Sequence, residues 1–363
     1  MSTTGTDDGG ATARPELVDR PDLLTPEWLT AALRSAGHDI HVTAVEREQV
    51  GTGQMGTSVR VRMSTEGDHD VPDTLVAKLP SPDETKRAIV AGIYRTEVSF
   101  YRELAPTLAV RTPRLWYSDL SSDWHRFVLL LEDLAPRRQG DQILGCDVEQ
   151  SRRAVENLAG LHGPRWCDPT LEADWMTIVR GDGAEMVAMI TRDATDRFLG
   201  RYHDRLDAAD RHLLDAIPAK LASWILARDD RFAPLHGDYR LDNLLFGEGP
   251  DPVAAVDWQT VTLGLPGRDV AYFLSTGLAP ELRRRHEREL VEAYHATLLG
   301  HGVRDHPMEE CWDDYCFGML QGPLITIVGA AYGEVTERGD EMFLAMATRS
   351  CAAIRDHEVL DRV

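Results

Sequence analysis

The stretch LHGDYRLDNLLF, residues 235–246, carries the strongest chemical signal in the chain. Asp238 is followed five residues later by Asn243, and the apolar run after Asn243 predicts a short strand. A second apolar run, VAAVDW, reaches Asp257 fourteen residues beyond Asn243. Phosphoryl transfer needs such a set, because one carboxylate accepts the proton of the attacking hydroxyl and further oxygen ligands hold Mg²⁺ on the phosphates. We therefore predict Asp238 as the catalytic base, and Asn243 and Asp257 as the metal ligands.

A glycine-rich segment lies far upstream, in the run VGTGQMGTSV at residues 50–59. Gly51, Gly53 and Gly56 follow the pattern G-x-G-x-x-G, which also occurs in ordinary turns and in dinucleotide-binding folds. A dinucleotide-binding fold would place a helix after the glycines and an acidic residue about twenty positions further on. Here the run SVRVRM after the glycines predicts a strand. A glycine-rich turn between two strands is typical of a loop that covers the phosphates of ATP.

Lys78 is one of only three lysines in the chain and lies in the compact strand TLVAKL, predicted at 74–79. A lysine in that place can reach the α- and β-phosphates of ATP, and it needs a carboxylate to hold it. The following helix, predicted at 86–105, offers Glu97 and Glu103. Glu97 shares the apolar face of that helix, whereas Glu103 lies on the polar side. We therefore predict that Glu97 is the partner of Lys78.

The pattern of the sequence changes near residue 132. Before it, a helix is predicted at 21–37, with Thr25 as its N-cap and Pro26 at the first helical position, and a second helix at 86–105. Strands are predicted within 40–64 and at 74–79, 108–120 and 126–132. The strand FVLLLE (127–132) is apolar enough for a central position in a sheet. After it, one β-rich island at 233–261 interrupts long helical patterns, at 148–162, 184–200, 207–227, 280–300, 307–332 and 339–357. The chain is thus predicted to be an α+β protein with a disordered tail (1–20), an N-terminal lobe (21–131) and a larger, mainly helical C-terminal lobe (132–363).

The composition of the 363 residues is that of an ordinary globular protein, with 43% hydrophobic and 27% charged residues. A formal net charge of −21 argues against nucleic-acid binding, which needs a basic surface. No run of eighteen apolar residues indicates a membrane span, and the polar first residues lack the apolar core of a secretion signal. The five cysteines are an odd number without a zinc-type spacing. These features predict a cytoplasmic protein with reduced thiols, as a monomer or homodimer with neither nucleic-acid nor membrane partners.

The motifs together resemble the aminoglycoside phosphotransferase/choline kinase superfamily, the small-molecule relatives of protein kinases. HGDYRLDN matches that family's H-G-D-x-x-x-x-N, and VDW (256–258) takes the place of the protein-kinase D-F-G. LAGLHGPRW (158–166) and the segment from Gly264 to Phe273 resemble two further family signatures. The resemblance covers about residues 45 to 275. Neither a protein-kinase H-R-D nor an A-P-E motif is present, which argues against a protein substrate.

The resemblance implies a bilobal protein-kinase-like fold, an N-terminal lobe that binds ATP, and a C-terminal lobe that binds the acceptor. It also implies that the adenine lies against the linker at Glu132–Leu134 and is bound through backbone groups there. His236 would be structural and brace the catalytic loop. The implied reaction is the transfer of the γ-phosphate of ATP, with Mg²⁺, to a hydroxyl of a small molecule.

Two questions stay open at this point. A catalytically silent, kinase-like regulator would share the fold, but Lys78, Asp238, Asn243 and Asp257 are all present, which favours an enzyme. The class of acceptor is undecided. The acidic and aromatic run EECWDDY (309–315) would suit a cationic acceptor such as an aminoglycoside, although it is also typical of a solvated helix start. The apolar run from Gly318 to Gly333 would suit a lipid-like alcohol, or it is simply core.

Overall fold

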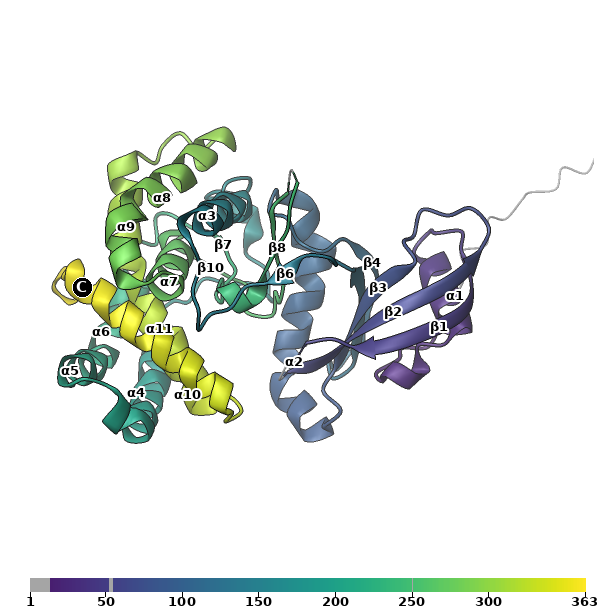
Figure 1. The fold of residues 1–363 in the computed structure, drawn as a ribbon, viewed down its shortest axis with the longest axis horizontal. Helices are drawn as coiled ribbons and strands as arrows, with labels where there is room; N and C mark the ends of the chain where they lie inside the picture. Colours follow the sequence, from purple (N-terminus) through teal and green to yellow (C-terminus); the bar gives the residue numbers. More distant parts are fainter. Residues whose placement is uncertain (1–13, 52–54, 250) are drawn as a thin grey trace, which may run out of the picture. The chain divides into compact units, whose positions relative to one another are not determined.

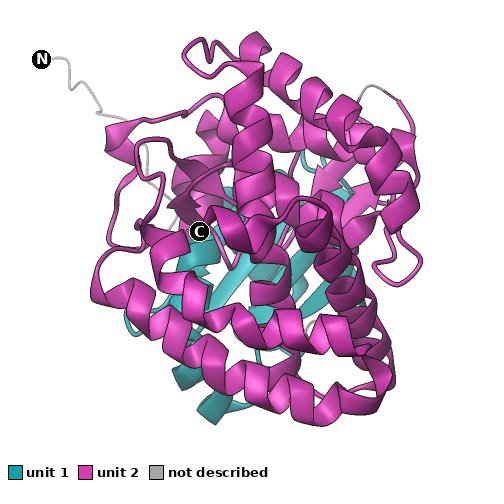
Figure 2. Cartoon of the chain, turned by 90° about the vertical axis from the view of Figure 1, so that its left-hand side faces the viewer, with its two compact units in different colours: residues 1–98, 113–133 teal, residues 99–112, 134–363 magenta. Residues whose placement is uncertain are grey.

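The computed structural model describes residues 14–51, 55–249 and 251–363 (Figure 1). The chain divides into two compact units (Figure 2). The first comprises Met1–Val98 and Pro113–Asp133, and the second comprises Ser99–Thr112 and Leu134–Val363. The structure therefore differs in one respect from the lobe boundary predicted near residue 132, because residues 99–112 group with the second unit.

The first unit is built on a five-stranded antiparallel sheet with the order β1-β2-β3-β5-β4. The strands are β1 (His41–Gln49), β2 (Gly56–Glu66), β3 (Thr74–Pro80), β4 (Leu115–Leu120) and β5 (Phe127–Glu132). In β5, the FVLLLE strand, the first five residues are buried, and the strand pairs on both sides. The central position predicted for this strand is confirmed.

Two helices accompany this sheet. α1 (Pro26–Ser35) begins where the side chain of Thr25 accepts a hydrogen bond from the Trp28 amide, as expected for an N-cap. Its apolar face joins the core of the sheet. α2 (Glu84–Ser99) carries Tyr94, whose hydroxyl donates to the Met55 carbonyl at 2.6 Å. α2 thereby stays next to the start of β2.

The helix predicted at 86–105 does not stay α-helical to its end. After Ser99 the chain forms a π-helical turn, η2 (Phe100–Leu104), and then a 3₁₀ turn, η3 (Ala105–Thr107). The wider turn accompanies the burial of Phe100, whose ring stacks on Trp258 with centroids 3.9 Å apart. Turns of this kind inside helices are often found at functional sites.

The second unit is mainly helical, as predicted. Its helices are α3 (Val148–His162), α4 (Asp182–Tyr202), α5 (Ala208–Ala216), α6 (Pro218–Leu226), α7 (Gly267–Gly277), α8 (Pro280–Gly300), α9 (Met308–Phe317), α10 (Gln321–Tyr332) and α11 (Glu337–Asp356). Short strands form the β-rich island and its neighbour: β6 (Arg138–Gln139), β7 (Ala233–Leu235), β8 (Leu244–Phe246), β9 (Val253–Ala255) and β10 (Thr262–Gly264). β8 pairs with β6 and β9, and β7 pairs with β10.

Two predicted helices are divided. The pattern at 207–227 breaks into α5 and α6 at Pro218, because proline lacks the amide hydrogen that a helix interior requires. The pattern at 307–332 is interrupted by a 3₁₀ turn at Gly318–Leu320. A further helix, α7, was not predicted as such. It is buried along most of its length and packs against α9, α10 and α11, so it forms the centre of this unit.

The segment Met308–Tyr332 is, within the described residues, one helical run whose length and composition would allow it to cross a membrane. In its most apolar window, 67% is buried inside the protein. Burial of that kind is what a core helix shows.

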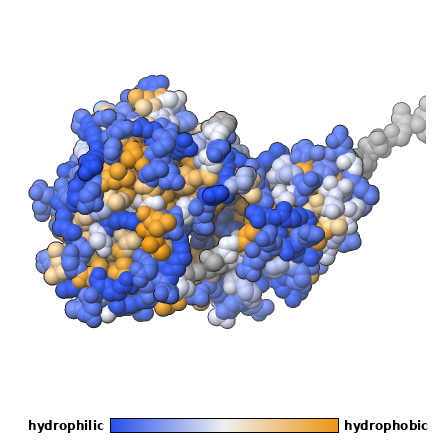
Figure 3. Space-filling view, in the orientation of Figure 1, coloured by the Kyte–Doolittle hydropathy of each residue, from blue (hydrophilic) through white to orange (hydrophobic). Residues whose placement is uncertain are grey.

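Exposed large apolar side chains occur mainly in the second unit. Figure 3 shows them as separate orange areas on a face that is otherwise largely hydrophilic. The most exposed of them are Leu144, Ile89, Val335 and Met189, and Ile89 belongs to the first unit. Separate apolar residues of this kind are common on protein surfaces.

Candidate active site

The loop His236–Asn243 connects β7 to β8. A side chain of α7 holds its backbone through hydrogen bonds. The Asp269 carboxylate, which is fully buried, accepts hydrogen bonds from the amides of His236 (2.6 Å) and Gly237 (3.1 Å). Gly237 has a φ of +79°, and a Cβ at this position would lie 2.6 Å from the Thr260 carbonyl oxygen. Only glycine fits both constraints, since the left-handed region disfavours other residues and the space is filled by backbone. The loop therefore has one well-defined backbone path.

His236 connects this loop to the strand end that carries Asp257. Its Nδ1 accepts the Asp238 amide at 3.3 Å, so the ring hydrogen is on Nε2, which donates to the Val256 carbonyl at 3.1 Å. The imidazole is fully buried and lies against Trp258, with ring centroids 4.6 Å apart. Both ring nitrogens are used in backbone contacts, which agrees with the structural role expected for His236.

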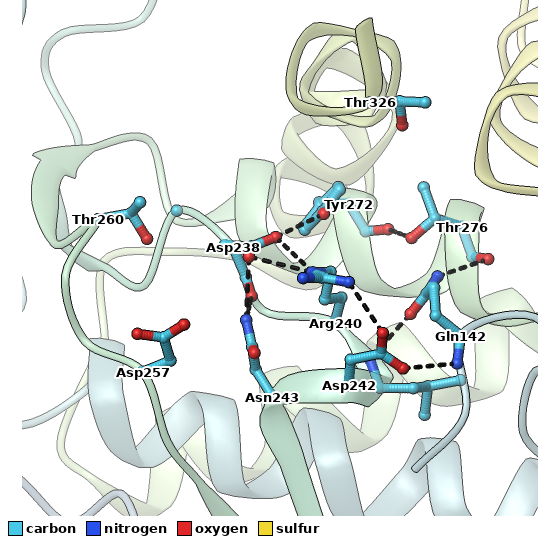
Figure 4. Close-up of polar contacts among 12 residues, drawn as sticks. Gln142, Asp238, Arg240, Asp242, Asn243, Asp257, Thr260, Tyr272, Thr276 and Thr326 are labelled. Atoms are coloured by element: carbon cyan, nitrogen blue, oxygen red, sulfur yellow. Dashed lines mark hydrogen bonds and ion pairs between the residues drawn. The ribbon is translucent and has the colours of Figure 1, made fainter. Parts of the chain in front are cut away.

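Asp238 lies at the centre of a group of hydrogen-bond donors (Figure 4). The carboxylate accepts from the Tyr272 hydroxyl at 2.7 Å, from Arg240 Nε at 3.0 Å and from Asn243 Nδ2 at 3.0 Å. Burial raises the pKa of Tyr272 well above its usual value, so its hydroxyl stays protonated and acts as a donor. The Asp238 side chain keeps 20% of its surface exposed. A carboxylate held in this way has a fixed orientation and remains accessible.

Asn243 and Asp257 present oxygen atoms suited to a hard cation. The Nδ2 of Asn243 donates to both the backbone oxygen (2.8 Å) and the carboxylate of Asp238, which turns the amide oxygen away from that carboxylate. Asp257 follows β9 with a φ of +69°, unusual for a residue other than glycine, and its carboxylate accepts from Gln259 Nε2 at 3.3 Å. Figure 4 shows Asp257 and Asn243 below Asp238.

The donor set fits Mg²⁺ bound to a nucleotide. Among the residues that the structure describes, no group of three or more His, Cys, Asp or Glu side chains could hold a metal ion alone. Mg²⁺ on phosphates needs no such group, because it is usually held by one or two protein oxygens together with phosphates and waters. The unusual backbone of Asp257 is also of the kind found at functional positions.

In the first unit, Lys78 and Glu97 form the predicted pair. Lys78 Nζ on β3 lies 2.6 Å from Glu97 Oε1 on α2, and the Glu97 side chain is only 2% exposed. Of the three predicted glycines, Gly51 has a φ of +72°, and a Cβ on Gly56 would lie 2.6 Å from the Leu79 carbonyl oxygen. Gly53 lies outside the described residues.

The two predicted adenine contacts are at the end of the first unit and the start of the second. Glu132 ends β5, and its amide donates to the Arg114 carbonyl at 2.9 Å. Its carboxylate accepts from the Arg114 amide at 3.0 Å. Leu134 is 7% exposed. Between them, Asp133 accepts from Arg60 Nε at 2.7 Å, an ion pair that no sequence pattern predicted.

Comparison with known families shows a match to the phosphotransferase enzyme family over residues 53–306. The chain belongs to this family. It is therefore a small-molecule phosphotransferase with a kinase-like fold, and the sequence resemblance is confirmed.

Solved structures agree with this phosphotransferase in fold. A protein assigned as an aminoglycoside phosphotransferase, from Ralstonia eutropha JMP134, is 18% identical with a TM-score of 0.54, over 92% of this chain and 98% of that one. The GDP and kanamycin complex of APH(2″)-IIIa is 15% identical with a TM-score of 0.52, over 86% and 94%. Choline kinase from Cryptosporidium parvum Iowa II is 11% identical with a TM-score of 0.50, over 88% and 90%.

A curated relative matches only a short part of the phosphotransferase. Acyl-CoA dehydrogenase family member 10 of Mus musculus is 46% identical over 63 residues, which are 16% of this chain and 6% of that protein. The chain thus spans only a small fraction of this relative's length.

Several residues around Asp238 were not singled out from the sequence. Arg240 Nη1 contacts Asp242 at 3.1 Å, and Asp242 also accepts two hydrogen bonds from Arg338 at 2.9 Å. Burial alone would lower the pKa of Arg240, but the charges of Asp238 and Asp242 outweigh it and raise the pKa above its usual value. The HGDYRLDN motif contains two of these residues, but Arg338 comes from α11. No local pattern connects Arg338 to the loop.

The acidic and aromatic helix α9 does not present its charges freely. Each of its carboxylates pairs with an arginine: Glu309 with Arg288, Glu310 with Arg231, Asp313 with Arg228 and Arg362, and Asp314 with Arg228 and Arg231. Cys311 and Tyr315 on the same helix are buried. These contacts favour a structural role for α9 over a binding site for a polycation.

Proposed function

We propose that this chain is a Mg²⁺- and ATP-dependent O-phosphotransferase that acts on a hydroxyl of a small molecule. The observation that carries the proposal is the arrangement of Asp238 and Asn243. The amide nitrogen of Asn243 holds the Asp238 carboxylate, and its amide oxygen would be left to hold a cation, so one residue would serve both parts of the reaction. Family membership and the GDP-bound structural neighbour support nucleotide use.

In the proposed reaction the acceptor oxygen attacks the γ-phosphorus of ATP in line. A new oxygen–phosphorus bond forms, the bond from the γ-phosphorus to the β–γ bridging oxygen breaks, and ADP leaves. The proton of the acceptor hydroxyl passes to the Asp238 carboxylate. Tyr272, Arg240 and Asn243 keep that carboxylate oriented. No covalent phospho-enzyme is required.

The nucleotide would be held by the residues predicted for it. Lys78, kept in place by Glu97, would contact the α- and β-phosphates, and the backbone of the Gly51–Gly56 segment would cover them. The backbone at Glu132 and Leu134 would contact the adenine. Asn243 and Asp257 would hold Mg²⁺, which neutralises the phosphate charge when bound.

The acceptor is proposed only as a small-molecule hydroxyl compound. Among the structural neighbours, APH(2″)-IIIa binds kanamycin and another neighbour is a choline kinase, so both supply candidate acceptor classes. The paired carboxylates of α9 give no particular support to a polycation. We also propose a cytoplasmic location, and no nucleic-acid partner, from the composition.

The test is ATP consumption with Mg²⁺ against a panel of aminoglycosides, amino alcohols, sugars and hydroxyacyl thioesters. The Asp238→Ala protein serves as the blank, and Asp204→Ala, whose side chain is fully exposed, as the matched control. We expect turnover with one class by the natural protein and the control alone. Turnover that survives in the Asp238→Ala protein would rule out Asp238 as the base. ATP binding without turnover across the panel would favour a non-catalytic regulator.

A further inference from the structure

We infer that Arg338, on α11, is a positioning residue for the base and acts through Asp242 and Arg240. This inference rests on the proposed function, since it concerns the orientation of the same carboxylate. It adds a residue about a hundred positions away from the catalytic loop.

A continuous series of ion pairs leads from Arg338 to Asp238. Arg338 Nη1 and Nη2 donate to the two oxygens of Asp242, each at 2.9 Å. Asp242 accepts from Arg240 Nη1 at 3.1 Å, and Arg240 Nε donates to Asp238 at 3.0 Å. The Asp242 side chain is only 9% exposed, so the carboxylate between the two arginines is largely shielded from water. Figure 4 shows Arg240 between the two carboxylates.

Arg240 is shared by two carboxylates that compete for it. Arg240 contacts both Asp238 and Asp242, and Arg338 contacts Asp242 as well. A buried carboxylate without another cation would draw Arg240 toward itself, because an unpaired buried charge is costly. Arg338 supplies that second cation. Arg240 Nε is thereby left to hold Asp238.

The backbone supports this arrangement at both ends. Thr336 caps α11 by accepting the Gly339 amide at 3.0 Å, which fixes the turn that carries Arg338. The Gln142 amide donates to Asp242 at 3.0 Å, and its side-chain oxygen accepts the Leu241 amide at 2.9 Å. Asp242 therefore has a fixed position, and the paired geometry of its contact with Arg338 suits a guanidinium better than an ammonium.

A purely structural role predicts a different result from a positioning role. The Arg338 side chain is 55% exposed, and an ion pair with so exposed a partner contributes little to stability. Arg205, in the short turn η5 (His203–Arg205), offers a matched control, because its Nη2 contacts both oxygens of Glu341 on α11 at 2.9 and 3.0 Å and its side chain is 48% exposed. Arg205 is not connected to Asp238 by any of the contacts described above.

The experiment measures kcat and the KM for ATP of Arg338→Gln, Arg338→Lys and Arg205→Gln, with slow Mg–ATP hydrolysis as the readout if no acceptor is known. We expect Arg338→Gln to lose about tenfold in kcat with an unchanged KM, as misplacement of a reacting group does. Arg338→Lys should recover part of the loss, and Arg205→Gln should match the natural protein. In an Arg240→Gln background, Arg338→Gln should have no further effect, since it acts through Arg240.

A crystal structure of Arg338→Gln gives a readout that does not depend on activity. We expect Arg240 to have left Asp238 for Asp242. An Arg240–Asp238 contact that is unchanged, a kcat equal to that of the natural protein, or effects of Arg338 and Arg240 that multiply, would each overturn the inference. The proposed function fails separately, if Asp238→Ala is as active as the natural protein.

Discussion

The carboxylate of Asp269 receives the backbone amide of His236 at 2.6 Å, inside a fully buried environment. The second oxygen of Asp269 accepts the Gly237 amide at 3.1 Å, so one side chain on α7 fixes two consecutive amides of the His236–Asn243 loop. The loop conformation therefore depends on a residue that does not itself contact Asp238.

Replacing Asp269 by Asn should disturb this loop. An amide has one acceptor oxygen, so its NH₂ group would face a backbone N–H and one buried donor would lose its partner. We expect about 1–3 kcal/mol of lost stability and a fall in kcat larger than any change in the KM for ATP. Chemical denaturation and steady-state kinetics measure the two effects. Wild-type kcat in a folded Asp269→Asn protein would contradict the positioning role.

Lys78→Met should weaken ATP binding. The variant lacks the ammonium group that would contact the phosphates, and hydrogen bonds to charged groups contribute about 1.5–3 kcal/mol, which corresponds to a rise of about 13- to 160-fold in the dissociation constant for ATP. Glu97→Gln should act in the same direction but less strongly, because Lys78 keeps its charge. Calorimetric titration with ATP measures both. Lys86→Met is the matched control. An equal loss of ATP affinity in that variant would rule out a specific contact between Lys78 and the phosphates.

Asp257→Asn should weaken metal binding without lowering the stability of the protein. Asparagine tolerates the left-handed region at least as well as aspartate, so we expect the unfolding temperature not to fall. Loss of the carboxylate should remove the increase in nucleotide affinity that Mg²⁺ produces. Nucleotide titration with Mg²⁺ and with EDTA tests this. An unchanged Mg²⁺ effect would exclude Asp257 as a ligand.

His306 should make stability depend on pH. Burial, together with the charge of Arg231, lowers its pKa from 6.5 to about 4. The unfolded chain therefore takes up a proton near pH 6.5, whereas the folded protein does so only near pH 4, and stability falls as the pH falls between these values. In His306→Gln this pH-dependent contribution to stability should be absent. We expect the advantage of the natural protein over the variant to shrink from pH 7 to pH 4 in thermal melts, and a constant difference would contradict the assignment.

Local signals in the sequence were sufficient for much of the fold. Thr25 before Pro26 predicted a helix start, and the continuous apolar run of β5 predicted its interior position, because both depend on neighbouring residues alone. The pairing of Lys78 with Glu97 followed from one helical face. Asp238 and Asn243 could be grouped because they lie in one short loop.

Other features depend on contacts between distant segments and left no local pattern. Arg338 reaches Asp242 from α11, and Gln142 reaches the same residue from the loop before α3. α7 was not predicted as a helix, and the burial of nearly all its residues depends on α9, α10 and α11, which are distant in sequence and pack around it. The change to a π-helical turn at Phe100 likewise depends on Trp258, which is remote in sequence.

The order of the two units along the chain limits how this protein can be divided into independent fragments. Residues 99–112 belong to the second unit, where Phe100 stacks on Trp258, Thr112 accepts from the Trp258 indole at 2.8 Å, and the Gly160 carbonyl accepts the amides of Ala109 and Val110 at 3.0 Å. A truncation that begins at Leu134 would remove this segment and expose the surface that it covers. Neither unit is thus available as a single contiguous fragment. An isolated catalytic unit would have to be made by circular permutation or by supplying residues 99–112 on a linker, and a single recombination crossover could not exchange one unit for that of a relative.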